Sequence, residues 1–387
     1  MVNVCVTGIG LTSALGSNTE KVWQALLAGQ SALMLRQPFF DLGVYPLGLI
    51  GKTPEALPPL LLSTVAQALE DANLQRPQSD CGVVVGSSRS HQADWERLGH
   101  QTQGHLQGDL GELSTLWKPP WLATLPHMPA IATAQYLQST GPLLAPMAAC
   151  ATGLWSIIQG YDLIRSGHCD RVVVGAVETP ITPLTLVGFE KMGALAKTGC
   201  YPFDINRAGL VLGEAAAILV LEAESVAIAR KSPNYGHILG FGATADGHHV
   251  SAPDPQRTGG ITAIIQCLQR SDIEPEAVDY IHAHGTSTRL NDQNEADLIA
   301  QCFPHRPAVS STKGATGHTL GASGALGLAF CLLAMRDRVL PPCTGLRSPA
   351  FDLNFVRRAQ TADINTALCM SFGFGGQNVV VAVRGNA

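Results

Sequence analysis

Short apolar runs alternate along the chain with segments in which apolar residues recur at helical spacing. The strand-like runs are residues 2–7, 82–86, 171–175, 215–221, 280–283 and 379–383. Residues 19–27 follow the helical spacing, and either Ser17 or Asn18 can cap that helix. Strands that alternate with helices throughout a chain are typical of the α/β class. The pattern therefore predicts an α/β fold.

The alternation is interrupted near the middle of the chain. Residues 233–236 read Pro-Asn-Tyr-Gly, which is a turn sequence, and a new apolar run begins at His237. We therefore divide the chain into two α/β halves, residues 1–235 and residues 236–387. The two halves show no evident sequence identity, so the pattern alone does not establish a duplication.

One apolar segment is long enough to raise the question of a membrane span. Residues 319–335 are uncharged and rich in Gly, Ala and Ser, and Arg336 closes the segment. This length is marginal for crossing a bilayer, so we predict a buried helix and no membrane insertion. The residues after Met1 lack the basic region of a secretory signal, which favours a cytoplasmic protein.

Composition narrows the function further. Of 387 residues, 46% are hydrophobic and 14% are charged, and the formal net charge of −5 argues against a nucleic-acid-binding protein. The ten cysteines are scattered, with neither a CxxC pair nor metal-ligand spacing. We therefore expect a reducing compartment, no bound metal, and core positions for nine of the ten.

Cys150 has the setting of a nucleophile. Small residues flank it, and the apolar spacing of residues 154–164 predicts a buried helix directly afterwards. The amino-terminal end of a helix stabilises a thiolate, whereas burial in apolar surroundings raises the pKa of a thiol. A cysteine in such a position is either a reactive group at a helix start or a packed core residue.

Two histidine motifs and a glycine-rich segment favour the reactive interpretation. His282 and His284 end the strand-like run 280–283, and His318 ends the glycine-rich segment 313–318. Residues 371–378 form a third motif, whose backbone N–H groups could stabilise an oxyanion. Taken singly, each histidine would more often be a satisfied structural residue.

Together these fragments resemble the elongating-type β-ketoacyl-[acyl carrier protein] synthases, the thiolase-fold condensing enzymes of fatty-acid and polyketide synthesis. The resemblance covers nearly the whole chain. Its fragments, in the family's order, are residues 6–10 (VTGIG), 23–31 (WQALLAGQS), 149–153 (ACATG), 202–204 (PFD), 213–215 (GEA), 284–288 (HGTST), 291–292 (ND), 317–318 (GH) and 373–376 (GFGG). The resemblance implies a thiolase-like fold, with two similar α/β halves stacked as a layered αβαβα core. The first half would carry the nucleophile and the second both catalytic histidines.

The resemblance also implies a decarboxylative Claisen condensation that needs no cofactor. Cys150 would accept an acyl group from a carrier-protein thioester. His284 and His318 would flank the malonyl thioester carbonyl and stabilise the enolate left by loss of CO₂. Lys313 matches the lysine that supports this histidine site. The product would be a β-ketoacyl thioester.

Binding roles are implied in the same way. The backbone N–H groups of Cys150 and Phe374 would form the oxyanion hole, and Phe374 would gate the acyl pocket. Thr286 and Thr288 would hydrogen-bond the pantetheine arm. The expected partner is an acyl carrier protein that bears acyl and malonyl groups, and the expected assembly is a homodimer. His282 falls outside this set and is expected to be structural.

Two departures from the family pattern stand out. The family usually has Glu three residues after Gly324, where this chain has Gly327. That Glu normally pairs with the lysine at Lys313, so we expect Lys313 to find another acid, with Glu295 the nearest candidate, or solvent or an ion. In addition, residues 52–62 carry only one basic residue, Lys52, where family members often carry several near the carrier-docking surface. Standard docking is therefore in doubt.

Alternatives follow from these departures. One is a specialised ketosynthase for a polyketide or an unusual lipid. Another is a weakly active or non-catalytic partner subunit that resembles a chain-length factor, although Cys150 and both histidines argue against it. A thiolase would need a second catalytic cysteine near the C-terminus, and Cys369 lies just before the glycine-rich loop. The initiating type of synthase uses Cys-His-Asn, whereas this chain offers His318 as a second histidine.

Overall fold

The elements follow the apolar pattern, and most strands extend beyond the apolar runs. The computed structural model describes residues 2–103 and 121–386. Its strands are β1 (Val4–Ser13), β2 (Met34–Arg36), β3 (Tyr45–Leu47), β4 (Gly82–Gly86), β5 (Leu143–Leu144), β6 (Arg171–Glu178), β7 (Ala215–Ala223), β8 (Gly236–Ala245), β9 (Tyr280–His282), β10 (Ala308–Ser310), β11 (Val339–Leu340), β12 (Gln360–Thr361), β13 (Thr366–Gly373) and β14 (Gln377–Arg384). Its helices are α1 (Thr19–Leu27), α2 (Leu57–Asp71), α3 (Gln92–Gln103), α5 (Met128–Leu137), α6 (Thr152–Arg165), α7 (Pro183–Lys191), α8 (Glu224–Ala229), α9 (Thr258–Ser271), α10 (Arg289–Cys302), α11 (Lys313–Thr316) and α12 (Ser323–Asp337), with 3-10 turns at η1 (Pro275–Ala277) and η2 (Leu320–Ala322).

Helix α1 shows how local sequence sets an element. It covers the predicted residues 19–27, and its cap is Asn18, whose side chain accepts a hydrogen bond of 2.9 Å from the backbone N–H of Lys21. Val22, Trp23 and Leu26 form its buried face. The indole N–H of Trp23 donates to Asp337 at 2.7 Å, which ties α1 to the end of α12.

The strands form two groups with the same topology. In the order β10-β9-β13-β14-β8-β1-β7-β6-β4-β5, the first five belong to the second half of the chain and the last five to the first half. From the junction outwards, each group has two antiparallel pairings and then two parallel ones. Among the residues that the structure describes, strands of the two groups pair with each other only where Val4–Val6 lies antiparallel to Gly236–Ile238. The predicted fold of two similar α/β halves is confirmed.

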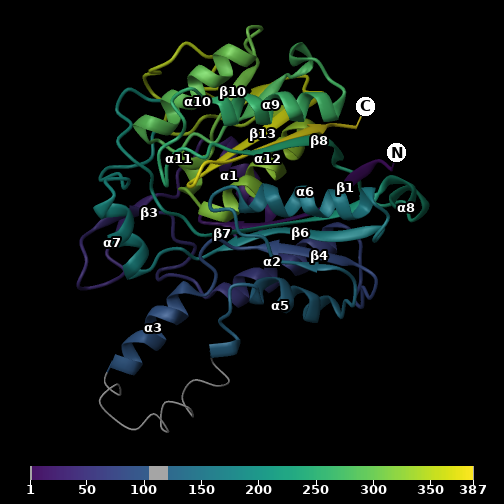
Figure 1. Cartoon of the computed structure of the whole chain (residues 1–387), viewed down its shortest axis with the longest axis horizontal. Helices are drawn as coiled ribbons and strands as arrows, with labels where there is room; N and C mark the ends of the chain where they lie inside the picture. Colours follow the sequence, from purple (N-terminus) through teal and green to yellow (C-terminus); the bar gives the residue numbers. More distant parts are fainter. Residues whose placement is uncertain (1, 104–120, 387) are drawn as a thin grey trace.

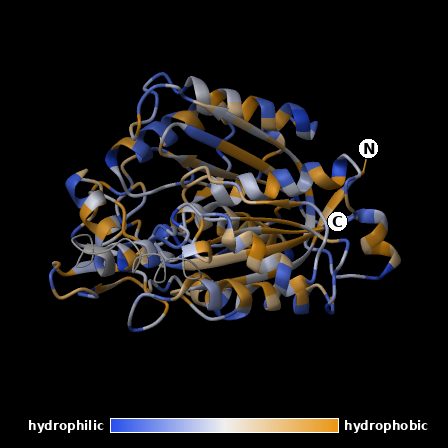
Figure 2. Ribbon diagram, turned by 60° about the horizontal axis from the view of Figure 1, so that its bottom comes forward, coloured by the Kyte–Doolittle hydropathy of each residue, from blue (hydrophilic) through white to orange (hydrophobic). Residues whose placement is uncertain are grey.

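Helices and sheets stack as five layers (Figure 1). Helices α2 and α5 cover the outer face of the first strand group, and α9 covers the second group with α10 beside it. Helices α6 and α12 pack against each other between the two groups. The strands between these layers are predominantly hydrophobic, whereas the outer helices alternate in colour (Figure 2). This is the αβαβα arrangement that the sequence predicts.

The apolar segment before Arg336 forms most of α12, which lies in the central helix layer beside α6. The stretch Leu320–Asp337 is long and apolar enough to cross a membrane by composition, but 89% of it is buried inside the protein. The prediction of a buried helix over residues 319–335 is therefore confirmed. All ten cysteines are free thiols; besides Cys150, seven are buried, and Cys169 and Cys302 are half-buried.

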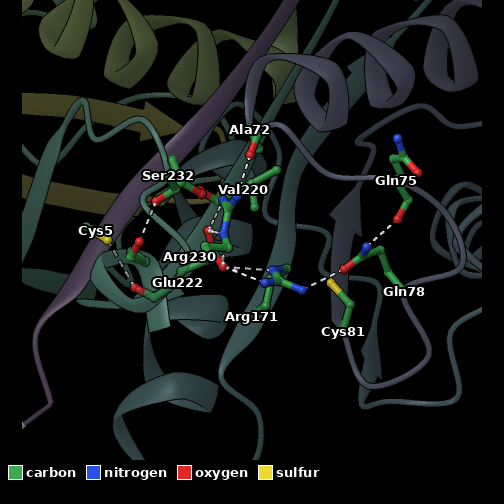
Figure 3. Close-up of polar contacts among 12 residues, drawn as sticks. Cys5, Ala72, Gln75, Gln78, Cys81, Arg171, Val220, Glu222, Arg230 and Ser232 are labelled. Atoms are coloured by element: carbon green, nitrogen blue, oxygen red, sulfur yellow. Dashed lines mark hydrogen bonds and ion pairs between the residues drawn. The ribbon is translucent and has the colours of Figure 1, made fainter. Parts of the chain in front are cut away.

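A buried ionic cluster ties the first strand group to its neighbouring segments (Figure 3). The fully buried carboxylate of Glu222 accepts hydrogen bonds from Arg171 at 2.7 Å and from Arg230 at 3.0 Å. Arg171 also donates to Gln78 at 2.6 Å, and Arg230 donates to the carbonyl of Ala72 at 2.7 Å. Burial alone would raise the pKa of Glu222, but the two guanidinium groups outweigh it and lower that pKa.

Candidate active site

Cys150 lies in a tight turn two residues before α6. Ala149 adopts the left-handed region with φ of 47°, which is a strained conformation for a residue with a Cβ. The hydroxyl of Thr152 holds the turn, because it accepts from the N–H of Ala148 at 2.9 Å and donates to the carbonyl of Ala149 at 2.7 Å. The apolar residues within 154–164, from which this helix was predicted, form the buried face of α6. The turn therefore presents Cys150 at the start of a buried helix.

His284 and His318 meet Cys150 at one point. The thiol sulfur and one ring nitrogen of each histidine all lie within 4.8 Å of one another. The two rings stand nearly perpendicular, at 82°, with centroids 5.3 Å apart. The Nδ1 atom of His318 is buried without a hydrogen-bond partner in the described structure. The site thus brings together three predicted residues from distant parts of the chain.

Burial controls the protonation of all three groups. It raises the pKa of Cys150 to about 11, although Lys313 and a hydrogen bond from the backbone of Phe374 oppose the shift. It lowers the pKa of His284 and that of His318 well below the usual range, and the charge of Lys313 adds to both shifts. At neutral pH the site therefore holds a thiol and two neutral imidazoles. Burial is the largest of the effects on the pKa of Cys150, so the thiol stays protonated although it lies at a helix start.

Lys313 opens α11 and is buried beneath the histidines. Its ammonium group donates to the carbonyl of His284 and lies 3.4 Å from the Nδ1 atom of the same residue. Burial lowers the pKa of Lys313, and the charge of Glu295 is the largest effect against that shift. Lys313 thus has a carbonyl as its direct partner, with Glu295 acting through its charge.

Two acids of α10 hold the loop that carries His284. Glu295 accepts from the backbone N–H groups of His284 at 2.6 Å and Gly285 at 2.7 Å, while Asp292 accepts from Ser287 at 3.1 Å. Burial raises the pKa of Glu295 to about 7 and that of Asp292 to about 6. The side chain of Asn291 also donates to Asp292 at 3.2 Å and to Glu295 at 3.3 Å. The sequence pattern did not reveal the contacts of the two acids with the loop, because the groups that donate there are main-chain N–H groups.

The glycine-rich loop after β13 closes the site from the opposite side. A Cβ on Gly373 would lie 2.9 Å from the carbonyl oxygen of Ala148 and 3.2 Å from the nitrogen of Cys150, so only glycine allows this approach. The next residue, Phe374, directs its N–H to Cys150, and its ring packs on Phe189 with centroids 6.0 Å apart. The two N–H groups expected to form the oxyanion hole therefore flank the thiol.

A cavity of about 270 Å³ leads to these groups. Its lining includes Cys150, both histidines and Phe374. Thr286 and Thr288 also line it, and their hydroxyls lie 2.9 Å apart. All the side chains that the sequence assigns to binding thus face one cavity, together with Cys150 and the two histidines.

The sulfur and two ring nitrogens could also hold a soft metal ion such as Zn²⁺, which favours thiolate and imidazole ligands. Such an ion would occupy the only thiol among the residues that line the cavity. It would therefore block nucleophilic chemistry there.

Comparisons with known proteins agree with this arrangement. A family model described as the N-terminal domain of beta-ketoacyl synthase matches residues 57–227, and a model of its C-terminal domain matches residues 235–347. The chain is 34% identical over 408 residues to 3-oxoacyl-[acyl-carrier-protein] synthase 2 of Coxiella burnetii, covering 97% of this chain and 96% of that relative.

Solved structures give the same result. A chain from the complex of a type II polyketide acyl-carrier protein with its ketosynthase, bound to the hexaketide, matches with a TM-score of 0.92 at 25% identity. A beta-ketoacyl synthase from Burkholderia phymatum matches with a TM-score of 0.90 at 27% identity. Both matches cover 100% of each chain. The chain therefore belongs to the beta-ketoacyl synthase family.

Proposed function

We propose that this protein condenses a Cys150-bound acyl group with a malonyl group on an acyl carrier protein, giving a β-ketoacyl thioester and CO₂. The observation that carries the proposal is the meeting of the Cys150 sulfur with His284 and His318 nitrogens within 4.8 Å, in one cavity. Family membership and the name of the Coxiella burnetii relative support the same reaction. The function is fatty-acid chain elongation.

The first step transfers the acyl group. Cys150 starts as a neutral thiol, so its proton passes to the neutral imidazole of His318 as the sulfur attacks the thioester carbonyl. The backbone N–H groups of Cys150 and Phe374 stabilise the oxyanion. The carrier thiolate leaves and takes up the proton, which leaves acyl-Cys150 and a free carrier thiol.

The second step decarboxylates the malonyl group. The C–C bond to the carboxylate breaks, CO₂ leaves, and the electron pair forms an enolate whose oxygen accepts from His284 and His318. Neutral imidazoles suit this role, since each offers one N–H donor. The enolate carbon attacks the acyl-Cys150 carbonyl, and the sulfur is released as a thiolate that regains a proton.

Binding and assembly complete the proposal. Thr286 and Thr288 bind the pantetheine arm, because their hydroxyls line the same cavity as Cys150. Lys313 fixes His284 through its contact with the carbonyl of that residue. The partner is an acyl carrier protein, in line with the solved ketosynthase complex.

The roles of the two halves, the compartment and the oligomeric state are proposed from membership of the family. Residues 1–235 act as the half that carries the nucleophile, and residues 236–387 act as the half that carries both histidines. The enzyme is a cytoplasmic homodimer.

The alternatives find less support. A chain-length factor would lack the nucleophile, whereas Cys150 is present in the cavity. Cys369 is fully buried on β13 and is not among the residues that line the cavity, which argues against a thiolase. A polyketide substrate remains the second candidate, because the solved ketosynthase complex was bound to a hexaketide.

A condensation assay tests the proposal. Purified protein is mixed with acyl and malonyl carrier proteins, and the products are read by mass spectrometry. We expect a β-ketoacyl carrier protein two carbons longer than the primer, and none from Cys150→Ala. Chain extension that persists in Cys150→Ala would refute the proposed nucleophile, and repeated extension of one primer would favour polyketide synthesis.

A further inference from the structure

A second group of buried polar side chains lies behind the histidine site and has no part in the proposed reaction. His282 ends β9, and its neighbours in the sheet are Cys369 on β13 and Ser310 on β10. Its ring is 2% exposed and does not line the cavity. Burial is the largest effect on the pKa of Cys369 and would raise it, but hydrogen bonds from Cys331 and His282 and the charge of Lys313 together lower that pKa.

Gly327 makes room for the His282 ring. A Cβ at this position of α12 would lie 2.6 Å from the Nδ1 atom of His282 and 3.0 Å from the sulfur of Cys369. Glycine inside a helix costs about 1 kcal/mol relative to alanine, so the chain accepts a less stable helix here. The ring of His282 thus fills the space into which a side chain at residue 327 would point. No glutamate fits at this position beside it.

The other side of the ring faces the turn that carries Lys313. The Nε2 atom of His282 lies 3.2 Å from the hydroxyl of Thr312, which is 3% exposed. Thr312 directly precedes Lys313, and its carbonyl accepts the N–H of Ala315 at 2.9 Å to begin α11. His282 therefore holds the residue from which the lysine turn starts.

We propose that His282 is a positioning residue, which acts through Thr312 to set Lys313 and hence the His284 loop for decarboxylation. Lys313 reaches the His284 carbonyl from a four-residue helix, so a shift of Thr312 is passed directly to that contact. Cys150 is held by its own turn and by the loop after β13, and neither involves His282. Loss of the His282 contact therefore impairs decarboxylation and spares acylation of Cys150. The inference rests on the proposed function, because decarboxylation is the step it concerns.

Variants at residue 282 test the contact, with CO₂ release from malonyl carrier protein and acylation of Cys150 measured separately. A Gln side chain reaches the position of Nε2, and an Asn side chain reaches only that of Nδ1. We expect His282→Ala and His282→Asn to slow CO₂ release about 10- to 100-fold. We expect His282→Gln to stay within about threefold of wild type, and acylation to change less than about threefold throughout.

Two further variants separate positioning from packing. Thr312→Val removes the hydroxyl at nearly constant volume, and we expect it to slow CO₂ release as His282→Ala does, with no added loss in the double variant. The matched control is Tyr280→Phe, which deletes a buried hydroxyl on the same strand, 2.7 Å from Ser310, and should leave CO₂ release unchanged. Thermal melting checks that each variant is folded.

The outcomes are distinct. Two results would overturn the inference and leave the proposed function intact. One is an equal loss of CO₂ release in His282→Gln and His282→Asn. The other is a double variant of His282→Ala and Thr312→Val in which the two losses add. Unchanged CO₂ release in Thr312→Val would do the same, even if the His282 variants did not fold. A wild-type protein that releases no CO₂ would overturn both the proposed function and the inference.

Discussion

The pKa of Cys150 is subject to opposing effects whose balance could not be predicted from the sequence. Its place before a helix was predictable, because small flanking residues and the apolar spacing after them are local features. Its burial was not predictable, since Phe374, Leu320 and Phe189 come from distant segments to enclose it. The pKa of Cys150 rises to about 11 because desolvation exceeds the effects of Lys313 and the Phe374 backbone. The residue types were therefore predictable and their protonation was not.

This protonation state predicts how Cys150 reacts with an alkylating agent. Because the raised pKa keeps the thiol protonated at neutral pH, the rate should climb about tenfold per pH unit from pH 7 to pH 9 without levelling. Short incubations with iodoacetamide, read by the mass of the Cys150 peptide, give the profile. A plateau below pH 8 would show instead that the helix start stabilises a thiolate.

The histidines predict a loss that is greatest in malonyl decarboxylation. His284→Ala and His318→Ala should each slow malonyl decarboxylation about 100- to 1000-fold, since each removes one oxyanion donor. Acylation of Cys150 should stay detectable in both, as the backbone oxyanion hole is intact. The readouts are CO₂ release and the mass of the intact protein. Near-normal CO₂ release from either variant would mean that the two rings do not act together.

At the scale of elements, apolar runs located the strands but not their lengths. Strand β1 continues through Gly8 and Gly10 to Ser13, although glycine disfavours strands. Strand β1 pairs with β7 along nearly its whole length, and these backbone hydrogen bonds stabilise the strand despite its low local propensity. The turn before α6 and the loop after β13 are far apart in the sequence and come into contact only in the folded chain. Sequence spacing could name these two loops but could not show that they touch.

That contact predicts the effect of one added methyl group. Gly373→Ala places a Cβ 2.9 Å from the carbonyl oxygen of Ala148, so the loop must shift and the Phe374 N–H must move away from Cys150. Condensation should fall at least about tenfold, with little change in melting temperature. The control is Gly188→Ala on α7, where a Cβ meets nothing within 4 Å and should leave activity intact. Equal activity in both variants would contradict the described contact.

At the scale of the whole molecule, the similarity of the halves lies in topology rather than in sequence. Both strand groups repeat the same order of pairings, yet the sequence gives no evident identity to reveal it. Backbone pairing tolerates many side chains so long as the apolar faces are kept. The α/β class was therefore readable from the apolar pattern. The doubled architecture came only from the family resemblance.

The ionic cluster of Figure 3 predicts a pH-dependent contribution to stability. Glu222→Gln leaves two guanidinium groups without a counter-charge and should lower the free energy of unfolding by about 3–5 kcal/mol. Since folding lowers the pKa of Glu222, this contribution is complete above the ordinary glutamate pKa of about 4.3 and declines as the pH falls from there through the lower pKa of the folded state. Urea unfolding at pH 7 and pH 3 measures both values.

The comparison variant is Glu224→Gln. Glu224 is 33% exposed and pairs with His237 at 2.8 Å. A partly exposed pair of this kind should contribute less than about 1 kcal/mol. A loss at Glu222 no larger than at Glu224, or one that is as large at pH 3 as at pH 7, would contradict the role given to the cluster.

Peptide mapping of the acyl-enzyme shows directly whether Cys150 carries the acyl group. The protein is incubated with an acyl carrier-protein thioester in the absence of malonyl groups, digested, and analysed by tandem mass spectrometry. We expect one acyl group per chain, on the peptide that contains Cys150, with the other nine cysteines unmodified. An acyl group found instead on Cys369 or on any other cysteine would contradict it.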